Sequence, residues 1–140
     1  MHELFNLSDD VAIVTGACRG IGEGIATTLN ISSRAAVMTV PGSGHYAAAK
    51  AGVNSLTVTF AQELGPRIRV DCVMPGAVPT EIMMTAMRLD DADLATLERR
   101  LRLPMRRLGT PEDLGAAVLY FVSPVSSWMT GQVLSVDGGM

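Results

Sequence analysis

Aromatic side chains and charge of either sign are scarce in this sequence. Only 4% of its 140 residues are aromatic and 18% are charged, whereas 48% are hydrophobic. A chain this apolar can bury a core, which argues against disorder, and its length suits one domain or a fragment of one. The formal net charge of -3 provides no basic field for nucleic acid. The arginine cluster at residues 99–107 is most simply interpreted as a solvated helix face.

Cysteines and long apolar runs are also few. Cys18 and Cys72 lie far apart in apolar or glycine-rich surroundings, which predicts free thiols in a reducing compartment. The first ten residues have no basic segment followed by an apolar one, so we expect no signal peptide. No apolar run reaches the roughly 18 residues that span a bilayer. We therefore expect a cytoplasmic protein without a membrane, nucleic-acid or metal partner.

A glycine-rich segment follows the first apolar run. Val11–Thr15 predicts a buried parallel strand, and residues 23–29 predict a helix. A strand, a glycine loop and a helix N-terminus together form a site for the pyrophosphate of a dinucleotide, because the glycines let the backbone approach and the helix supplies N–H donors. An ordinary turn is the alternative. The candidate cofactor-binding residues in this loop are Gly16, Cys18, Arg19, Gly20, Ile21 and Gly22.

Arg19 bears on the choice of dinucleotide. Its guanidinium could pair with the 2′-phosphate of NADP, or it could be a solvated loop charge that leaves NAD open. The residue that usually decides lies at the end of the second strand, about 20 residues after the glycines. Residues 41–45, Pro-Gly-Ser-Gly-His, are not such a strand end. We therefore favour NADP and keep NAD as the alternative.

Tyr46 and Lys50 form the second candidate site. Residues four apart share one helix face, with Cβ atoms about 5–6 Å apart. An ammonium beside a phenol stabilises the phenolate, which prepares the phenol to exchange a proton with an alcohol or a carbonyl. Taken alone, the same spacing is also typical of a surface pair.

The remaining chain alternates between strand and helix patterns. We predict that a strand ends within residues 30–33 and that further strands cover 68–74 and 133–136. We predict helices over residues 46–64, 81–102 and 110–123. The first has an apolar face at Val53, Leu56, Phe60 and Leu64, which suits either its own sheet or a second subunit. The second is rich in methionine, which suits core, interface or a lid over a substrate.

These motifs, in this order, resemble those of the short-chain dehydrogenase/reductase family. The resemblance rests on the glycine loop, on Asn30-Ile31-Ser32-Ser33 with Tyr46 and Lys50, on Pro75-Gly76 with Val78 and Thr80, and on two C-terminal patterns, Arg107-x-Gly109-x-Pro111-Glu112-Asp113 and Gly131-Gln132 through Asp137-Gly138-Gly139. It implies an α/β fold, a Rossmann-like doubly wound parallel sheet with helices on both faces. It also implies an NAD(P)-dependent oxidoreductase acting on a secondary alcohol or ketone, such as a 3-oxoacyl thioester or a hydroxysteroid-like substrate, in a homo-oligomer (a dimer or homotetramer).

The resemblance assigns roles to individual residues. Ser33, thirteen residues before Tyr46, would hydrogen-bond the substrate oxygen, and this spacing selects it over Ser32. Tyr46 would pass the proton, while Lys50 would stabilise the phenolate and hold the ribose hydroxyls. The nicotinamide would be held by Pro75, Gly76, Val78 and Thr80.

A segment of the family pattern is absent, so we expect one incomplete domain over residues 1–140. Strands two to four and most of strand five have no counterpart, nor have the adenine pocket and the catalytic Asn. In the family order 3-2-1-4-5-6-7, strand Val11–Thr15 would lose both neighbours, or pair with a new one. Asp71 also stands where Asn is common.

The missing segment would lie near residues 27–31, where the parts before and after it are joined. This junction has two explanations. Either the chain has an internal deletion, or the sequence joins two separate segments, which would leave an abnormal Cα spacing between Ala26 and Ile31; we favour the second. The absence also raises an alternative function: a catalytically dead remnant that serves as a binding or interface module.

Overall fold

Four parallel strands form the centre of the molecule. The computed structural model describes residues 11–15, 26–38 and 41–140. The sheet has the order β1-β2-β3-β4, and every neighbouring pair is parallel. The strands are β1 Val11–Thr15, β2 Ala26–Ile31, β3 Ile68–Pro75 and β4 Val133–Val136. The helices are α1 Gly44–Leu64, α2 Glu81–Met87, α3 Asp91–Leu101 and α4 Pro111–Val122, with short 3-10 turns η2 Arg34–Ala36 and η3 Pro124–Ser126.

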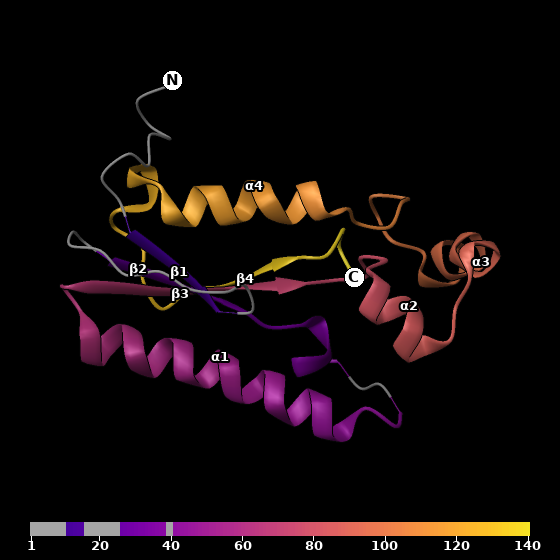
Figure 1. Cartoon of the computed structure of the whole chain (residues 1–140), viewed down its shortest axis with the longest axis horizontal. Coiled ribbons are helices and arrows are strands. Elements are labelled where there is room, and N and C mark those ends of the chain that lie inside the picture. The colour runs from indigo at the N-terminus through magenta and orange to yellow at the C-terminus, as the bar shows by residue number, and fades with distance from the viewer. Residues whose placement is uncertain (1–10, 16–25, 39–40) are drawn as a thin grey trace.

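Helices cover both faces of this sheet. Figure 1 shows α1 along one face and α4 along the other, which confirms the predicted Rossmann-like architecture. On the α4 side, Leu29 and Val73 pack with Phe121 and Val122 in the main apolar core. Because successive strand residues point to opposite faces, Cys72 faces α1 instead, where its thiol donates to Asn54 Oδ1 at 3.9 Å.

The strand β2 corrects the prediction of a helix over residues 23–29. Ala26–Ile31 is a strand that pairs with β1 on one side and β3 on the other, while residues 23–25 lie outside the described part of the chain. The helical pattern was short, and an isolated short helix is marginal in water. Pairing along both edges of one strand therefore decides the conformation. The strand end predicted within residues 30–33 is confirmed at Ile31.

The pairing of β2 also bears on the missing segment. Successive residues from Val11↔Ala26 to Thr15↔Asn30 are in register with β1, and the same stretch is in register with β3. The junction expected near residues 27–31 stays a prediction, because pairing in register does not distinguish an internal deletion from two joined segments. β1 is an edge strand of the sheet and pairs with β2, so it has the new pairing partner that was one of the two expectations.

The predicted helix over residues 81–102 is two helices. α2 ends at Met87, and Arg88 adopts a left-handed conformation with φ 54°. Asp90 then caps α3 by accepting a hydrogen bond from the backbone N–H of Asp93, whose own carboxylate accepts from the Asp90 N–H. This reciprocal capping box satisfies donors that a continuous helix would pair internally, so it stabilises the break.

The outer side of α1 is exposed. Thr57 and Ala61 are the buried residues of this helix, whereas Leu56, Phe60 and Leu64 are 49%, 39% and 37% exposed. Three of the four residues of the predicted apolar face are therefore exposed, whereas the fourth, Val53, is half-buried. α4 differs, because Phe121 and Val122 are buried in the core.

Candidate active site

Two consecutive serines follow β2 and have different roles. Ser32 is buried, and its hydroxyl donates to the backbone carbonyl of Lys50 at 3.0 Å. Ser33 is partly buried and caps the 3-10 turn η2, with its Oγ accepting from the Ala35 N–H at 3.2 Å. Because Ser33 Oγ is an acceptor in that bond, its own proton remains available to a ligand. The geometry thus separates a buried serine that bonds to α1 from a partly buried serine that caps the turn after β2.

Tyr46 and Lys50 lie on consecutive turns at the start of α1. Lys50 Nζ is 5.8 Å from the centroid of the Tyr46 ring, which confirms that the two side chains share a face. The ammonium donates to the carbonyl of Ile31 at 2.9 Å. Tyr46 is 44% exposed, so its phenol is accessible from solvent. A phenol and an ammonium on one exposed helix face are the groups that a proton-transfer site for an alcohol or a carbonyl uses.

Hydrogen bonds in both directions join α1 to the end of β2. Lys50 accepts at its backbone carbonyl from Ser32 and donates from its side chain to Ile31. The side chain of Asn30 adds a third tie, donating to Thr57 Oγ1 at 2.9 Å in the buried layer. These bonds fix the helix that carries Tyr46 relative to the strand that leads into Ser33.

The segment after β3 forms the next wall. The Gly76 N–H donates to the Val136 carbonyl at 3.0 Å, and a Cβ on Gly76 would lie 2.6 Å from the Asp137 Cα. Only glycine permits that approach. Val78 is buried, and Thr80 caps α2 by accepting from the Met83 N–H at 3.3 Å. The Thr80 hydroxyl therefore retains a proton that it can donate.

A hollow of about 210 Å³ lies against this same segment. It is lined by residues 76–78 and 136–138, by the first turn of α4, and by Met105, Arg107 and Gly109. Its charged groups are already paired: Arg107 binds both carboxylate oxygens of Asp113, at 2.6 and 2.7 Å. That hydrogen-bonded guanidinium holds the pKa of Asp113 far below its usual range. The candidate catalytic residues Ser33, Tyr46 and Lys50 lie outside this hollow.

Arg34 is a residue that the sequence analysis missed. Its Nε lies 3.0 Å from Asp137 Oδ2 in an ion pair, and its Nη2 donates to the Met140 carbonyl at 2.7 Å. Both side chains of the pair are largely buried. The residue next to Ser33 is therefore anchored to the C-terminal segment that packs on Gly76. No spacing pattern could have revealed a pair so far apart in sequence.

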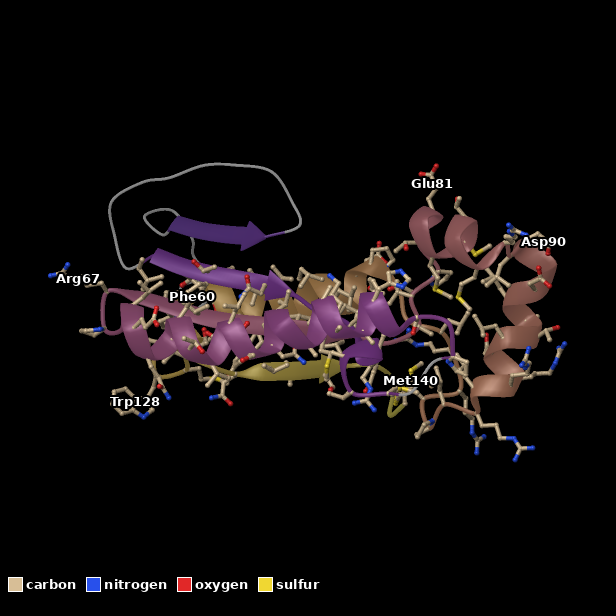
Figure 2. The ribbon with its side chains drawn as sticks, turned by 90° about the horizontal axis from the view of Figure 1, so that it is seen from below. Phe60, Arg67, Glu81, Asp90, Trp128 and Met140 are labelled. Atoms are coloured by element: carbon tan, nitrogen blue, oxygen red, sulfur yellow. The ribbon has the colours of Figure 1, made fainter. Side chains whose placement is uncertain are left out.

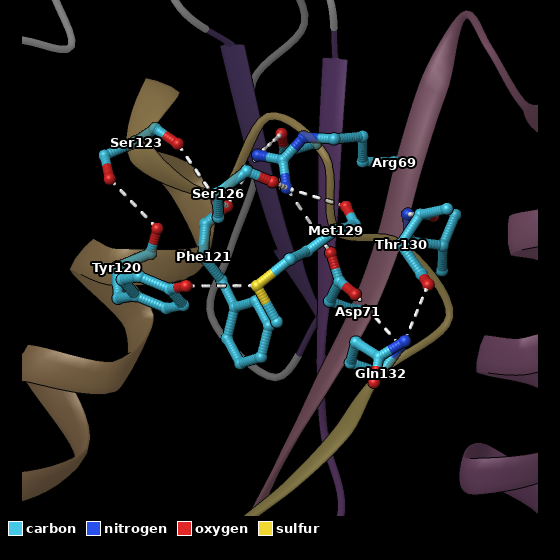
Figure 3. A network of polar contacts seen from close by, with 11 residues as sticks. Arg69, Asp71, Tyr120, Phe121, Ser123, Ser126, Met129, Thr130 and Gln132 are labelled. Atoms are coloured by element: carbon cyan, nitrogen blue, oxygen red, sulfur yellow. Dashed lines mark hydrogen bonds and ion pairs between the residues drawn. The ribbon is translucent and has the colours of Figure 1, made fainter.

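A buried network around Arg69 explains the Asp that stands where Asn is common. Asp71 is fully buried and accepts from the Gln132 N–H at 3.0 Å, with Arg69 Nη1 at 3.5 Å (Figure 3). The guanidinium also donates to the carbonyls of Phe121, at 2.6 Å, and Ser126, at 3.0 Å. Burial raises the pKa of Asp71, while the Gln132 N–H and Arg69 oppose that rise. The network fastens the loop before β4 to β3, away from Tyr46.

The glycine loop predicted to hold the cofactor lies outside the described residues, namely Gly16, Cys18, Arg19, Gly20, Ile21 and Gly22. Their assignment therefore stays a prediction. Within the described part of the chain, no helix is both long and apolar enough to cross a membrane.

Comparisons with known proteins agree on one family. Residues 11–140 match the family model described as Enoyl-(Acyl carrier protein) reductase. The chain is 42% identical over 113 residues to the 3-oxoacyl-[acyl-carrier-protein] reductase of Chlamydia muridarum, covering 80% of this chain and 44% of that relative. It is 41% identical to the Thermotoga maritima protein of the same name, over the same shares.

Solved structures give the same result. An NADPH-bound short-chain oxidoreductase from Pseudomonas aeruginosa, with an atypical catalytic center, superposes with a TM-score of 0.75 at 31% identity, covering 84% of this chain and 47% of the other. A 7α-hydroxysteroid dehydrogenase complexed with NADH and a 7-oxo bile acid gives 0.73 at 34% identity, with shares of 81% and 44%. The chain thus spans less than half the length of these proteins. On its sequence and its fold, the chain belongs to the short-chain dehydrogenase/reductase family.

Proposed function

We propose that the protein is an NAD(P)-dependent oxidoreductase that transfers a hydride between a nicotinamide and a secondary alcohol or ketone. The observation that carries the proposal is that Tyr46 and Lys50 share one face of α1. Hydrogen bonds from Lys50 to Ile31 and from Ser32 to Lys50 hold this helix against the end of β2, which leads into Ser33. Among possible substrates, a 3-oxoacyl thioester has the support of the reductases from Chlamydia and Thermotoga. A hydroxysteroid-like alcohol has the support of one structural neighbour.

In this proposal Ser33, Tyr46 and Lys50 have different roles at the alcohol or carbonyl oxygen of the substrate. Ser33 donates its free hydroxyl proton to the substrate oxygen and holds it near Tyr46. Tyr46 passes a proton to or from that oxygen, and Lys50 stabilises the phenolate. The ammonium has two further N–H donors beyond the bond to Ile31, which suit ribose hydroxyls.

The described residues also fit the nicotinamide end of a dinucleotide. The Thr80 hydroxyl retains its proton, which suits a carboxamide oxygen, and Pro75, Gly76 and Val78 form the wall beside it. When bound, the nicotinamide supplies or accepts the hydride. NADP is our preferred form because of Arg19, with NAD as the alternative. One structural neighbour is bound to NADPH and another to NADH.

Cys72 bears on the compartment. The thiol is free and buried, and burial raises its pKa, so it is a poor thiolate. A structural thiol of this kind suits the reducing cytoplasm, which is the compartment we propose.

Nucleotide binding and turnover test the proposal separately. We expect NADPH to bind in a fluorescence titration and a 3-oxoacyl thioester to be reduced. Tyr46→Phe removes the proton and is expected to lower kcat by about 10²- to 10⁴-fold with little change in NADPH binding. Gln62→Ala, an exposed change on the same helix, is the control and should leave both unchanged. Absence of binding at millimolar NADPH and NADH would favour the remnant hypothesis, which the enzyme relatives do not support.

We further propose that α1 pairs with a second copy of the chain, in a dimer or a homotetramer. Its exposed Leu56, Phe60 and Leu64 recur every four residues and form one apolar stripe. Sedimentation equilibrium tests this proposal. Phe60→Asp should yield a monomer, whereas Thr59→Asp, at the neighbouring exposed position, should not. An unchanged mass for Phe60→Asp would rule out this face.

A further inference from the structure

Three segments that are far apart in sequence meet at the carboxyl ends of neighbouring strands. β2, β3 and β4 are adjacent in that order and parallel, so their carboxyl ends lie at one edge of the sheet. Ser33 lies just after β2, Gly76 directly after β3 and Asp137 directly after β4. Figure 2 shows Met140 toward this end, with Arg67 and Trp128 at the opposite one. Ligands of open α/β sheets bind beyond such carboxyl ends.

The backbone ladder between β2 and β3 extends to the residue before Ser33. There the Ser32 N–H donates to the Val73 carbonyl at 2.8 Å. Ser33 itself begins the turn η2, in which its carbonyl accepts from the Ala36 N–H at 2.9 Å. This bond shapes the turn, and η2 also packs against α1. Neither contact fixes the distance from Ser33 to the segments that follow β3 and β4.

The side chain of Arg34 makes that connection. It extends from the end of β2 to the segment after β4, with β3 between them, which is about 10 Å at a strand spacing of about 4.8 Å. Its Nη2 donates to the Met140 carbonyl at 2.7 Å, and its Nε lies 3.0 Å from Asp137 Oδ2. Nε is buried and has no hydrogen-bond partner among the described residues, so the contact with Asp137 is an ion pair. The bond to Met140 orients the guanidinium.

The other end of this connection lies on the wall proposed for the nicotinamide. The Gly76 N–H donates to the Val136 carbonyl at 3.0 Å. A Cβ on Gly76 would lie 2.6 Å from the Asp137 Cα, so the two backbones are in direct contact. Arg34 therefore joins the turn of Ser33 to the wall at Gly76.

We propose that Arg34 is a positioning residue for hydride transfer, because it sets the place of the Ser33 hydroxyl relative to the nicotinamide wall. The proposal rests on the oxidoreductase function proposed above and adds a residue to that site. Arg34 acts through Ser33 and exchanges neither the proton nor the hydride. Its effect is on distance, and a displacement of about 1 Å between reacting groups can lower a rate by about 10²-fold.

The first test requires neither nucleotide nor substrate. Amide hydrogen exchange followed by NMR reports whether Arg34 orders the turn. Arg34→Met should speed exchange of the Ala36 N–H, whereas the Ser32 N–H, bonded to Val73, should stay protected. Arg67→Met removes the same charge from an exposed site at the opposite end of the sheet and should change neither amide. Equal protection of Ala36 in Arg34→Met and the wild type would overturn the proposal.

A single-turnover experiment separates positioning from folding. Enzyme loaded with one equivalent of NADPH is mixed with a saturating 3-oxoacyl thioester of N-acetylcysteamine, and NADPH fluorescence is followed. Loss of folded protein lowers only the amplitude, whereas loss of positioning lowers the rate constant. We expect Arg34→Met to lower the rate constant about 10- to 100-fold with NADPH affinity unchanged. Arg34→Lys keeps a cation for Asp137 and should recover part of the rate.

A second variant covers poor folding of Arg34→Met. The double variant with Asp137→Asn leaves no unpaired carboxylate and still lacks the connection, so it should also react slowly. A lower amplitude at an unchanged rate constant in both variants would overturn the positioning role alone. No turnover by the wild type with NADPH bound would overturn the proposed reaction, and the positioning role with it.

Discussion

The guanidinium of Arg34 lies 3.0 Å from the carboxylate of Asp137, which joins the turn after Ser33 to the segment that packs on Gly76. The two side chains are 23% and 12% exposed, so the pair is intermediate between a surface and a buried ion pair. We expect Arg34→Met to lower the free energy of unfolding by about 1–3 kcal/mol, because it leaves a partly desolvated carboxylate with one remaining donor, the Gly139 N–H. Urea denaturation measures the change.

A double-mutant cycle distinguishes the ion pair from local packing. Asp137→Asn removes the charge but keeps an oxygen for Gly139, so the single variant preserves that turn. The double variant with Arg34→Met should be more stable than the sum of the single effects allows, by about 0.5 kcal/mol or more. Strictly additive losses would mean that the two residues act independently.

Ser32 and Ser33 offer a matched pair of substitutions. Ser32→Ala removes the bond to the Lys50 carbonyl in a buried setting and should cost about 1 kcal/mol of stability. Ser33→Ala removes a cap on a three-residue turn and should cost less. If the proposed reaction holds, turnover should show the reverse order, with Ser33→Ala losing far more of kcat than Ser32→Ala. Equal losses of kcat would contradict the separation of roles.

Much of the fold could be predicted because its signals are local. Thr110-Pro111 begins α4 as expected, with the Thr110 side chain accepting from Asp113 N–H, and Gly65 ends α1. Only the end of β2 was recognised; its first residues resembled a helix, because their conformation depends on pairing with β1 and β3. The break at Arg88 also carries no Gly or Pro signal, since an arginine occupies the left-handed position.

The candidate site was predictable only where residues act within one element. The spacing of Tyr46 and Lys50 places them on one face, and the structure agrees. The contacts that seat them, from Lys50 to Ile31 and from Ser32 to Lys50, require knowledge of how α1 packs on β2. The ion pair of Arg34 is likewise a product of tertiary structure.

Asp71 is expected to be a destabilising charge at neutral pH. Its pKa is raised chiefly by burial, so stability falls as pH rises from the unfolded value, about 3.9, through the higher folded value. Asp71→Asn keeps an acceptor for the Gln132 N–H without the charge, so it should raise stability at pH 7. Asp71→Leu leaves that N–H unsatisfied and should cost about 1–3 kcal/mol. The advantage of Asn should disappear below the unfolded pKa, and an advantage that persists there would contradict the linkage argument.

Asp113 should show the opposite pH dependence. Its pKa is held far below the usual range by the hydrogen-bonded guanidinium of Arg107, with the Thr110 N–H as a second donor. The stabilisation it provides is therefore present above the unfolded pKa of about 3.9 and is lost as pH falls toward the folded value. Asp113→Asn keeps an acceptor for the cap of α4 but loses the ion pair, so the decline in unfolding midpoint between about pH 4 and pH 2 should become shallower than in the wild type. Arg107→Gln removes the other member of the pair and should make the same decline shallower. If the unfolding midpoint of both variants falls as steeply as that of the wild type, this ion pair does not determine the loss of stability in acid.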